Sequence, residues 1–235
     1  MLKISDITKF TLQDYPNHTA CIIWFAGCNM RCKFCHNVEF LEQNNNFLTE
    51  ERVFSFLEKR VGLFDGVVLS GGECTICDGF INFVKQIKQL GFKIKIDTNG
   101  LNFDIIKELV HNKLVNFIAL DFKAPLEKFT NVTQINEKQY SNFEKSLQFL
   151  IENNNKNNID LEIRTTVHTS LLQEDDINVI IDILDDLNYS QIYYIQNFRD
   201  DGKGTLCNLG EQKFLINKNL IKKPKHFSVE LRNFF

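Results

Sequence analysis

No apolar run in the sequence approaches the ~20 residues that a membrane-spanning helix needs, so a transmembrane protein is excluded. The first residues, Met1 to Asp6, lack the apolar stretch of a secretory signal peptide. Lys and Arg number 27 against 30 Asp and Glu, with no strongly basic block, which argues against nucleic acid as the main partner. The 5 histidines are scattered, and none lies in a hydrolase signature. These absences favour a cytoplasmic protein that is neither a nucleic-acid-binding protein nor a hydrolase.

Apolar residues and cysteines are plentiful. A hydrophobic share of 43% with 22 Phe is enough for a sizeable core, and 235 residues is an ordinary length for a single α/β domain. The 7 cysteines are an odd number without a secretory signal, which favours the reducing cytoplasm over a disulfide framework. We expect Cys21 and Cys207 to be packing residues.

Strand-like and helix-like segments alternate along most of the chain, which predicts a parallel sheet with helices outside it. The chain has six such strand–helix units, two fewer than a closed eight-stranded barrel, which predicts a partial (β/α)6 TIM-type barrel. We expect an N-terminal extension over 1–20, the barrel over 21–200, and a C-terminal tail over 201–235 that packs on or beside it. The predicted strands are 21–25, 66–69, 93–97, 115–121, 159–167 and 190–196. The predicted helices begin at Thr49, at an Asp78 N-cap, and at 104, 136 and 174, and an Asn-rich loop is expected over 153–158.

Cys28, Cys32 and Cys35 directly follow the first predicted strand, where α/β sheets place ligands and chemistry. Thiolates are soft ligands that suit zinc or iron–sulfur clusters. A structural zinc takes four ligands, usually from two separated pairs, so a zinc site that adds Cys74 and Cys77 is an alternative. The compact triplet better suits three irons of a 4Fe–4S cluster, with the fourth iron open to a non-protein ligand. An open metal position indicates a reactive site.

The triplet resembles the signature of the radical S-adenosylmethionine superfamily, Cys-x3-Cys-x2-Cys with an aromatic residue, here Phe34, before the last cysteine. Gly71, Gly72 and Glu73 end the second predicted strand and are similar to the Gly-Gly-Glu motif of that superfamily. The resemblance implies one 4Fe–4S cluster and S-adenosylmethionine as cofactors. It also implies that the two glycines let the backbone approach the methionine part of S-adenosylmethionine and that Glu73 accepts from its amino group.

Polar segments also end the next three predicted strands, at 97–100, 121–123 and 164–166. Because the carboxyl ends of parallel strands meet around one mouth, we expect these segments to lie together. Lys123 and Arg164 suit the carboxylate of S-adenosylmethionine through charge-assisted hydrogen bonds. No catalytic residue is expected beyond the cluster and the cofactor. The resemblance implies cofactor contacts from Thr98, Asn99, Asp121, Lys123 and Arg164.

Residues 12–16, 35–37, 120–125 and 164–167 resemble the anaerobic ribonucleoside-triphosphate reductase activating proteins, which are glycyl-radical enzyme activases. The chain departs from that pattern at Asn17, where Gly is usual, and at Cys74, where Pro is usual. We expect the first departure to alter only a turn. For Cys74 and Cys77 two interpretations stand: ordinary buried thiols or a redox-active pair.

The resemblance implies an oxidoreductase that reductively cleaves S-adenosylmethionine to a 5′-deoxyadenosyl radical and installs a glycyl radical on an anaerobic ribonucleoside-triphosphate reductase. The implied partners are that reductase and a flavodoxin or ferredoxin-type electron donor, without nucleic acid or membrane. One alternative is a radical enzyme that acts on a small molecule, similar to 7-carboxy-7-deazaguanine synthase. Another is a non-catalytic metal-binding or redox-sensing protein.

Overall fold

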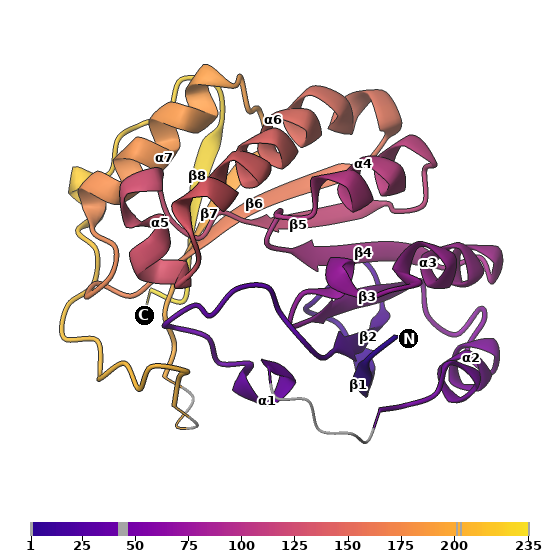
Figure 1. Cartoon of the computed structure of the whole chain (residues 1–235). Helices are drawn as coiled ribbons and strands as arrows, with labels where there is room; N and C mark the ends of the chain where they lie inside the picture. Colours follow the sequence, from indigo (N-terminus) through magenta and orange to yellow (C-terminus); the bar gives the residue numbers. More distant parts are fainter. Residues whose placement is uncertain (1, 42–46, 201, 203, 235) are drawn as a thin grey trace.

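The computed structural model describes residues 2–41, 47–200, 202 and 204–234, so the predicted boundary at residue 201 lies outside the described residues. The described residues form one eight-stranded sheet whose strands lie in sequence order (Figure 1). The first strand is antiparallel to the second, and every other neighbouring pair is parallel. The strands are β1 (Ile4–Thr11), β2 (Ala20–Phe25), β3 (Gly66–Gly71), β4 (Lys93–Thr98), β5 (Phe117–Asp121), β6 (Asp160–Val167), β7 (Ile192–Asn197) and β8 (Ser228–Arg232).

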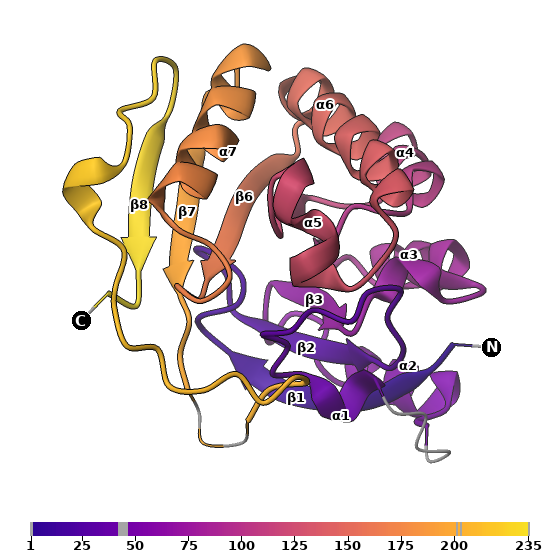
Figure 2. The same cartoon turned by 60° about the vertical axis from the view of Figure 1, so that its left-hand side comes forward.

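Helices cover the outer face of the curved sheet (Figures 1 and 2). Their apolar side chains recur at helical spacing, as in α3, where Phe80, Phe83, Val84 and Ile87 are all buried. The α-helices are α1 (Val38–Leu41), α2 (Glu50–Glu58), α3 (Phe80–Gln89), α4 (Phe103–His111), α5 (Leu126–Thr133), α6 (Tyr140–Asn157) and α7 (Glu174–Asp186). Short 3₁₀ turns span Cys74–Ile76, Glu137–Gln139 and Lys218–Leu220. The predicted α/β partial barrel with parallel strands and outer helices is confirmed.

Two strands lie outside the six that the sequence predicts. β1 comes from the segment 1–20, and β8 comes from the tail and pairs with β7. Both are edge strands with several exposed residues, so they lack the continuous apolar pattern of the inner strands. The six predicted strands are β2 to β7, and of the described strands the sequence pattern missed only these two edge strands.

The helix expected to start at 136 is also different in the structure. Asn136 instead caps a 3₁₀ turn by accepting from the Lys138 N–H, and α6 follows it. The Asn-rich loop expected over 153–158 is wrong, because α6 continues to Asn157 with Asn154 buried, and ends at Asn158 in the left-handed region. The N-cap of α3 is Gly79 rather than Asp78.

Side chains along the strands alternate between the helices and the interior of the barrel. On β2, Ile23 belongs to the core beneath the helices, whereas Ile22 belongs to a smaller inner cluster. That inner cluster consists of Tyr15, Ala20, Ile22, Val68, Phe117 and Ala119. On β4 and β6 the same alternation places Ile96 and Ile163 in the outer core and leaves Asp97 and Arg164 to line interior cavities.

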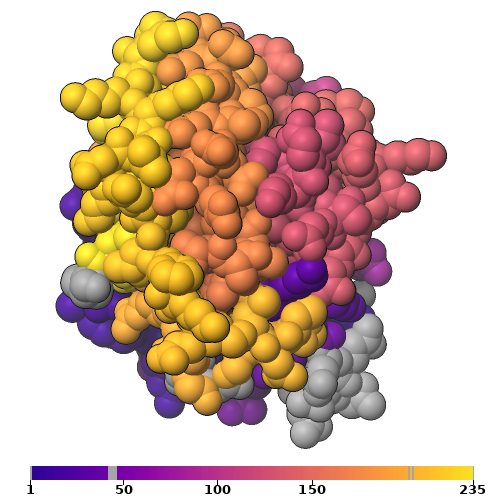
Figure 3. Space-filling model, turned by 90° about the vertical axis from the view of Figure 1, so that its left-hand side faces the viewer, coloured from indigo at the N-terminus to yellow at the C-terminus, as the bar shows by residue number. Residues whose placement is uncertain are grey.

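The sheet runs from β1 to β8 without a pairing between these two strands in the described part of the chain, so the barrel is open along one side. The residues that follow β7, coloured orange to yellow, spread over one side of the molecule (Figure 3). Leu206 in this segment donates its N–H to the carbonyl of Cys35 over 3.1 Å, so the C-terminal region contacts the cysteine-bearing loop. No described helix is long and apolar enough to cross a membrane.

Candidate cofactor site

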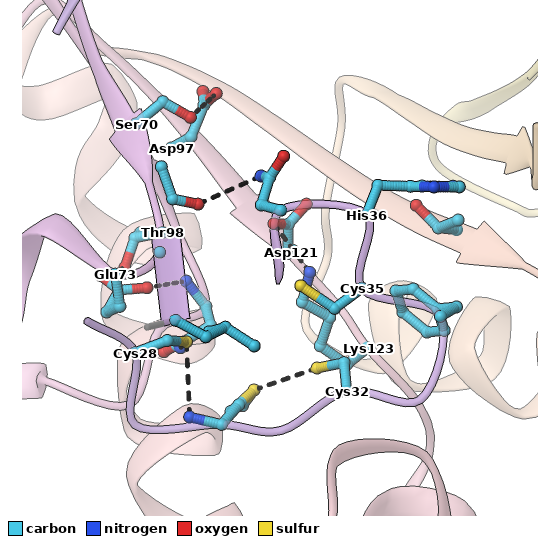
Figure 4. A pocket seen from close by; sticks show the side chains of 18 of the residues that line it. Cys28, Cys32, Cys35, His36, Ser70, Glu73, Asp97, Thr98, Asp121 and Lys123 are labelled. Carbon is cyan, nitrogen blue, oxygen red and sulfur yellow. Dashed lines mark hydrogen bonds and ion pairs between the residues drawn. The ribbon is translucent and has the colours of Figure 1, made fainter. Parts of the chain in front are cut away.

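A cavity of about 240 Å³ opens at the carboxyl ends of the parallel strands (Figure 4). The strand register brings their last residues together, since Trp24 pairs with Ser70 and Asp121 pairs with Arg164. All the residues to which the sequence assigned a cluster or cofactor role line this cavity, although their roles as ligands stay predictions. They are Cys28, Cys32, Cys35, Gly71, Gly72, Glu73, Thr98, Asn99, Asp121, Lys123 and Arg164.

The cysteine loop is held by the C-terminal end of α5. The N–H groups of Arg31 and Lys33 donate to the carbonyls of Thr133 and Val132 over 2.9 and 3.0 Å. Helix carbonyls at this end have no partner within the helix, so the loop satisfies them. Within the loop, Met30 donates its N–H to the Cys28 sulfur over 3.4 Å. The loop therefore has a defined backbone path between β2 and α1.

The three thiols of the triplet line one cavity. Among the described residues, no group of three or more Cys, His, Asp or Glu side chains is close enough to hold a single metal ion. Burial raises the pKa of Cys28 to about 11 and that of Cys32 to about 12. Both are thus protonated at neutral pH in the protein alone, and binding of iron must displace the protons.

Cys74 and Cys77 do not join the triplet in lining the cavity. The Cys74 sulfur is fully buried and faces the carbonyl oxygens of Leu69 and Asp97 at 3.8 and 3.7 Å. Among the described residues, the two groups of cysteines do not come together in this cavity, where the zinc alternative would need them. Cys21 is buried as expected, but Cys207 is exposed, so its expected packing role was wrong. The tail carries Cys207 across the surface, where its sulfur accepts from the Gln134 side chain.

Glu73 is the carboxylate best fixed in the cavity. Its Oε1 accepts from the Thr98 hydroxyl over 2.7 Å, and its Oε2 accepts from the Asn99 N–H over 2.7 Å. Thr75 also donates its hydroxyl to Oε1, over 2.6 Å. Burial raises the pKa of Glu73 above its ordinary 4.5, although these donors act in the opposite direction. A carboxylate held in this way can accept a hydrogen bond from a ligand amino group.

Gly71 and Gly72 are required by close packing of the cysteine loop against β3. A Cβ on Gly72 would lie 2.0 Å from the carbonyl oxygen of Gly27 and 3.4 Å from the Cβ of Cys28. Gly71 has φ +119°, and a Cβ there would lie 2.4 Å from the Phe25 carbonyl oxygen. In addition to the predicted approach to a cofactor, these glycines therefore bring the Cys28 loop onto the end of β3.

Charged side chains form a network along the opposite wall. Arg164 Nε donates to Asp121 Oδ1 over 2.6 Å, and Lys123 Nζ donates to Asp121 Oδ2 over 3.0 Å. Although burial acts to raise it, these two cations hold the pKa of Asp121 well below its usual range. Asp97 accepts from Ser70 over 3.0 Å and pairs with Lys95.

Several site residues were missed by the sequence reasoning. Asn29 accepts from the Asn99 side chain over 2.7 Å and so links the cysteine loop to the end of β4. Lys95 and Glu162 lie two residues before Asp97 and Arg164 on the same face of their strands. Charged residues at alternate positions of otherwise apolar strands were the signal that could have found them.

A second cavity, of about 690 Å³, lies on the open side of the barrel. It shares Asp97 and Arg164 with the first cavity and reaches the residues between β1 and β2 and the end of β8. Its wall carries amide side chains at Gln13, Gln196 and Asn233. Its charged lining residues are Asp14, Lys95, Asp97, Glu162, Arg164 and Arg232.

The model of the Radical SAM superfamily matches residues 22–187. The chain belongs to the radical SAM superfamily. This radical SAM protein is 34% identical over 196 residues to a Methanocaldococcus jannaschii protein named "Putative glycyl-radical enzyme activating enzyme". The aligned region covers 83% of the chain and 79% of that relative. The chain is also 31% identical over 129 residues to the pyruvate formate-lyase-activating enzyme of Clostridium pasteurianum, covering 52% of the chain and 53% of that enzyme.

Among solved structures, SuiB of Streptococcus suis bound to S-adenosylmethionine has a similar fold. The TM-score is 0.58 at 14% identity, covering 89% of the chain and 51% of SuiB. The radical SAM chain thus spans about half the length of SuiB and of the Clostridium enzyme. A 4Fe–4S cluster and S-adenosylmethionine are the cofactors of this superfamily, and the donor set fits them: three thiols for three irons, with carboxylate and cationic groups beside them.

Proposed function

We propose that this radical SAM enzyme activates a glycyl-radical enzyme, by removing a hydrogen atom from a glycine Cα of an anaerobic ribonucleoside-triphosphate reductase. Two relatives named as activating enzymes support the activase role, and the resemblance of residues 12–16, 120–125 and 164–167 supports the reductase as the target. The single electron that the reaction consumes would come from a flavodoxin or ferredoxin-type donor.

The observation that carries the proposal is the charge balance of the second cavity. Its three cations face three carboxylates, so it offers no excess positive charge to a nucleotide or to a heterocyclic acid. Its amide side chains suit the N–H and C=O groups of a polypeptide. The cavity lies on the open side of the barrel and meets the cofactor cavity at Asp97 and Arg164. This arrangement favours an extended polypeptide loop as the substrate.

In this proposal the residues of the first cavity bind and orient the cofactors. Cys28, Cys32 and Cys35 would hold the cluster, while Met30 and Phe34, both buried beside them, exclude water. When bound, the cluster and S-adenosylmethionine together supply the 5′-deoxyadenosyl radical chemistry. Glu73 would accept from the amino group of S-adenosylmethionine. Lys123 and Arg164 would hold its carboxylate.

The test is direct transfer of hydrogen from the partner. The chain is reconstituted anaerobically with iron and sulfide, reduced, and mixed with S-adenosylmethionine and an anaerobic ribonucleoside-triphosphate reductase labelled with Cα-deuterated glycine. We expect a glycyl radical by electron paramagnetic resonance and deuterium in the 5′-deoxyadenosine that is released.

Two outcomes would contradict the proposal: one would refute only the activase role, and the other would refute the radical chemistry itself. Cleavage of S-adenosylmethionine without a radical on any glycyl-radical enzyme of the source cell would refute the activase role and favour a small-molecule substrate. Absence of cleavage in protein that carries a full cluster would refute radical chemistry altogether and favour a metal-binding or sensing role.

A further inference from the structure

Arg232, the last residue of β8, reaches from the edge of the sheet into the charge network of the cofactor site. Its two terminal nitrogens donate to the two carboxylate oxygens of Glu162, each over 3.0 Å. Its guanidinium also stacks on Tyr194, with the carbon 3.4 Å from the ring centroid. This bidentate, stacked geometry is specific to arginine. β8 lies outside residues 22–187, which match the superfamily model.

Glu162 lies between two guanidinium groups. Besides Arg232, its Oε1 lies 3.7 Å from Arg164 Nη1. The Glu162 side chain is only 6% exposed, so its charge requires a cationic partner. With Arg232 in place, Arg164 is free to bond Asp121 and to approach Asp97 within 3.6 Å. Without Arg232, Arg164 would be the closest cation left to Glu162.

The charge count of the connected network leads to the same conclusion. Among the residues joined by these ion pairs, four cations face three carboxylates, so this network has one cation in excess. One excess charge matches the single carboxylate of S-adenosylmethionine, and removal of Arg232 would cancel it. The cations are Lys95, Lys123, Arg164 and Arg232, and the carboxylates are Asp97, Asp121 and Glu162.

We propose that Arg232 is a positioning residue for S-adenosylmethionine, which neutralises Glu162 and thereby keeps Arg164 directed toward Asp121 and the cofactor cavity. The proposal rests on the part of the proposed function that assigns Lys123 and Arg164 to the cofactor carboxylate. It does not depend on the identity of the protein substrate.

The test compares charge-matched variants of cluster-loaded protein. The dissociation constant for S-adenosylmethionine is measured by equilibrium dialysis, and the electron paramagnetic resonance spectrum of the reduced cluster is recorded with and without S-adenosylmethionine. Arg232→Gln should weaken binding about tenfold, within the range of coupled charged pairs. The double variant Glu162→Gln/Arg232→Gln restores the excess of one charge, so it should bind within about threefold of the wild type. Arg232→Lys should give an intermediate value.

Arg60 provides the matched control, because it also stacks on an aromatic ring, at 3.8 Å from the Phe56 centroid, but outside the charge network. Arg60→Gln should bind S-adenosylmethionine like the wild type. Wild-type affinity in Arg232→Gln, or a double variant as weak as Arg232→Gln, would overturn the proposal.

A second comparison covers the case in which Arg232→Gln does not fold. In the Glu162→Gln background no buried carboxylate needs Arg232, so adding Arg232→Gln should change the affinity by less than about threefold. A tenfold loss in that background would also overturn the proposal. Glycyl-radical formation is measured separately, so a failure of the activase role with normal S-adenosylmethionine binding is distinguishable from a failure of this inference.

Discussion

At the scale of single residues, the alternation of side chains along the strands decides which groups meet in the cavity. Glu162 and Arg164 point inward from β6, while Ile163 between them packs against the helices. Cys28, Cys32 and Cys35 reach the same cavity from a loop, without a strand periodicity. The site thus combines a local motif with groups selected by strand register.

Loss of one cysteine of the triplet should remove the cluster. Cys35→Ala leaves two thiols, too few for stable ligation of a 4Fe–4S cluster, so iron after reconstitution should fall from about four per chain to less than about one. Cys207→Ala, at an exposed thiol, is the control and should keep its iron. Iron and sulfide analysis with visible absorbance provides the measurement. Full iron content in Cys35→Ala would show that the triplet is not the ligand set.

Because of Asp121, the free energy of unfolding should depend on pH in the acid range. Its pKa is lower in the folded chain than its ordinary 3.8, so the stabilisation is present above 3.8 and is lost as the pH falls toward the folded value. Unfolding by urea of the cluster-free protein should therefore show a steeper loss of stability below about pH 4 in the wild type than in Asp121→Asn. Equal slopes for the two proteins would contradict the assigned pairing with Arg164 and Lys123.

At the scale of elements, the cysteine loop is clamped between the end of β3 and the end of α5. Gly72 donates its N–H to the Phe25 carbonyl over 2.8 Å, and Glu73 donates its N–H to the Gly27 carbonyl over 2.8 Å. On the other side, Thr133 and Val132 of α5 accept from the loop. Two elements that are distant in sequence therefore hold the cysteine loop at the mouth of the barrel.

Gly72→Ala should disrupt this clamp. The added Cβ would meet backbone atoms of Gly27, which have no flexible side chain to move aside, so we expect a loss of about 2 kcal/mol or more and poor cluster retention. Gly91→Ala is the control: its φ is +90° but nothing lies within 4 Å of the new Cβ, so it should cost only about 1 kcal/mol of backbone strain and keep the cluster. Urea unfolding and iron content distinguish the two variants.

At the scale of the whole molecule, the open sheet leaves two neighbouring cavities that share lining residues. The first lies against the cysteine loop, and the second reaches the side of the barrel between the Gln13 loop and the end of β8. Both cavities are lined by Asp97 and Arg164, whose side chains form an ion pair at 3.6 Å.

Filling the second cavity should lower the yield of glycyl radical without lowering the cleavage of S-adenosylmethionine. Gln13→Trp adds a large side chain to its wall, so glycyl-radical yield should fall about tenfold or more while reductive cleavage of S-adenosylmethionine stays within about twofold of the wild type. Gln89→Trp, at an exposed residue at the end of α3, is the control for the added indole. An unchanged radical yield in Gln13→Trp would place the protein substrate elsewhere.

The outer core and the order of the parallel strands were predictable, because buried strands such as β2 are nearly continuous apolar runs and their helices carry apolar stripes. The placement of the predicted site residues around one mouth followed from the parallel arrangement. β8 was not predictable, because an edge strand needs no apolar pattern and its stability comes from its pairing with β7.

The sequence by itself determined that a compact cysteine triplet follows the first buried strand, because its ligand spacing is a local property of the chain. Only the tertiary structure decided that the Cys28 loop packs closely against Gly72 and that Arg232 pairs with Glu162. The second pair is separated by 70 residues in the chain, and the two side chains meet only through the register of β6, β7 and β8. Such contacts depend on strand register and side-chain direction, which no local pattern of residues encodes.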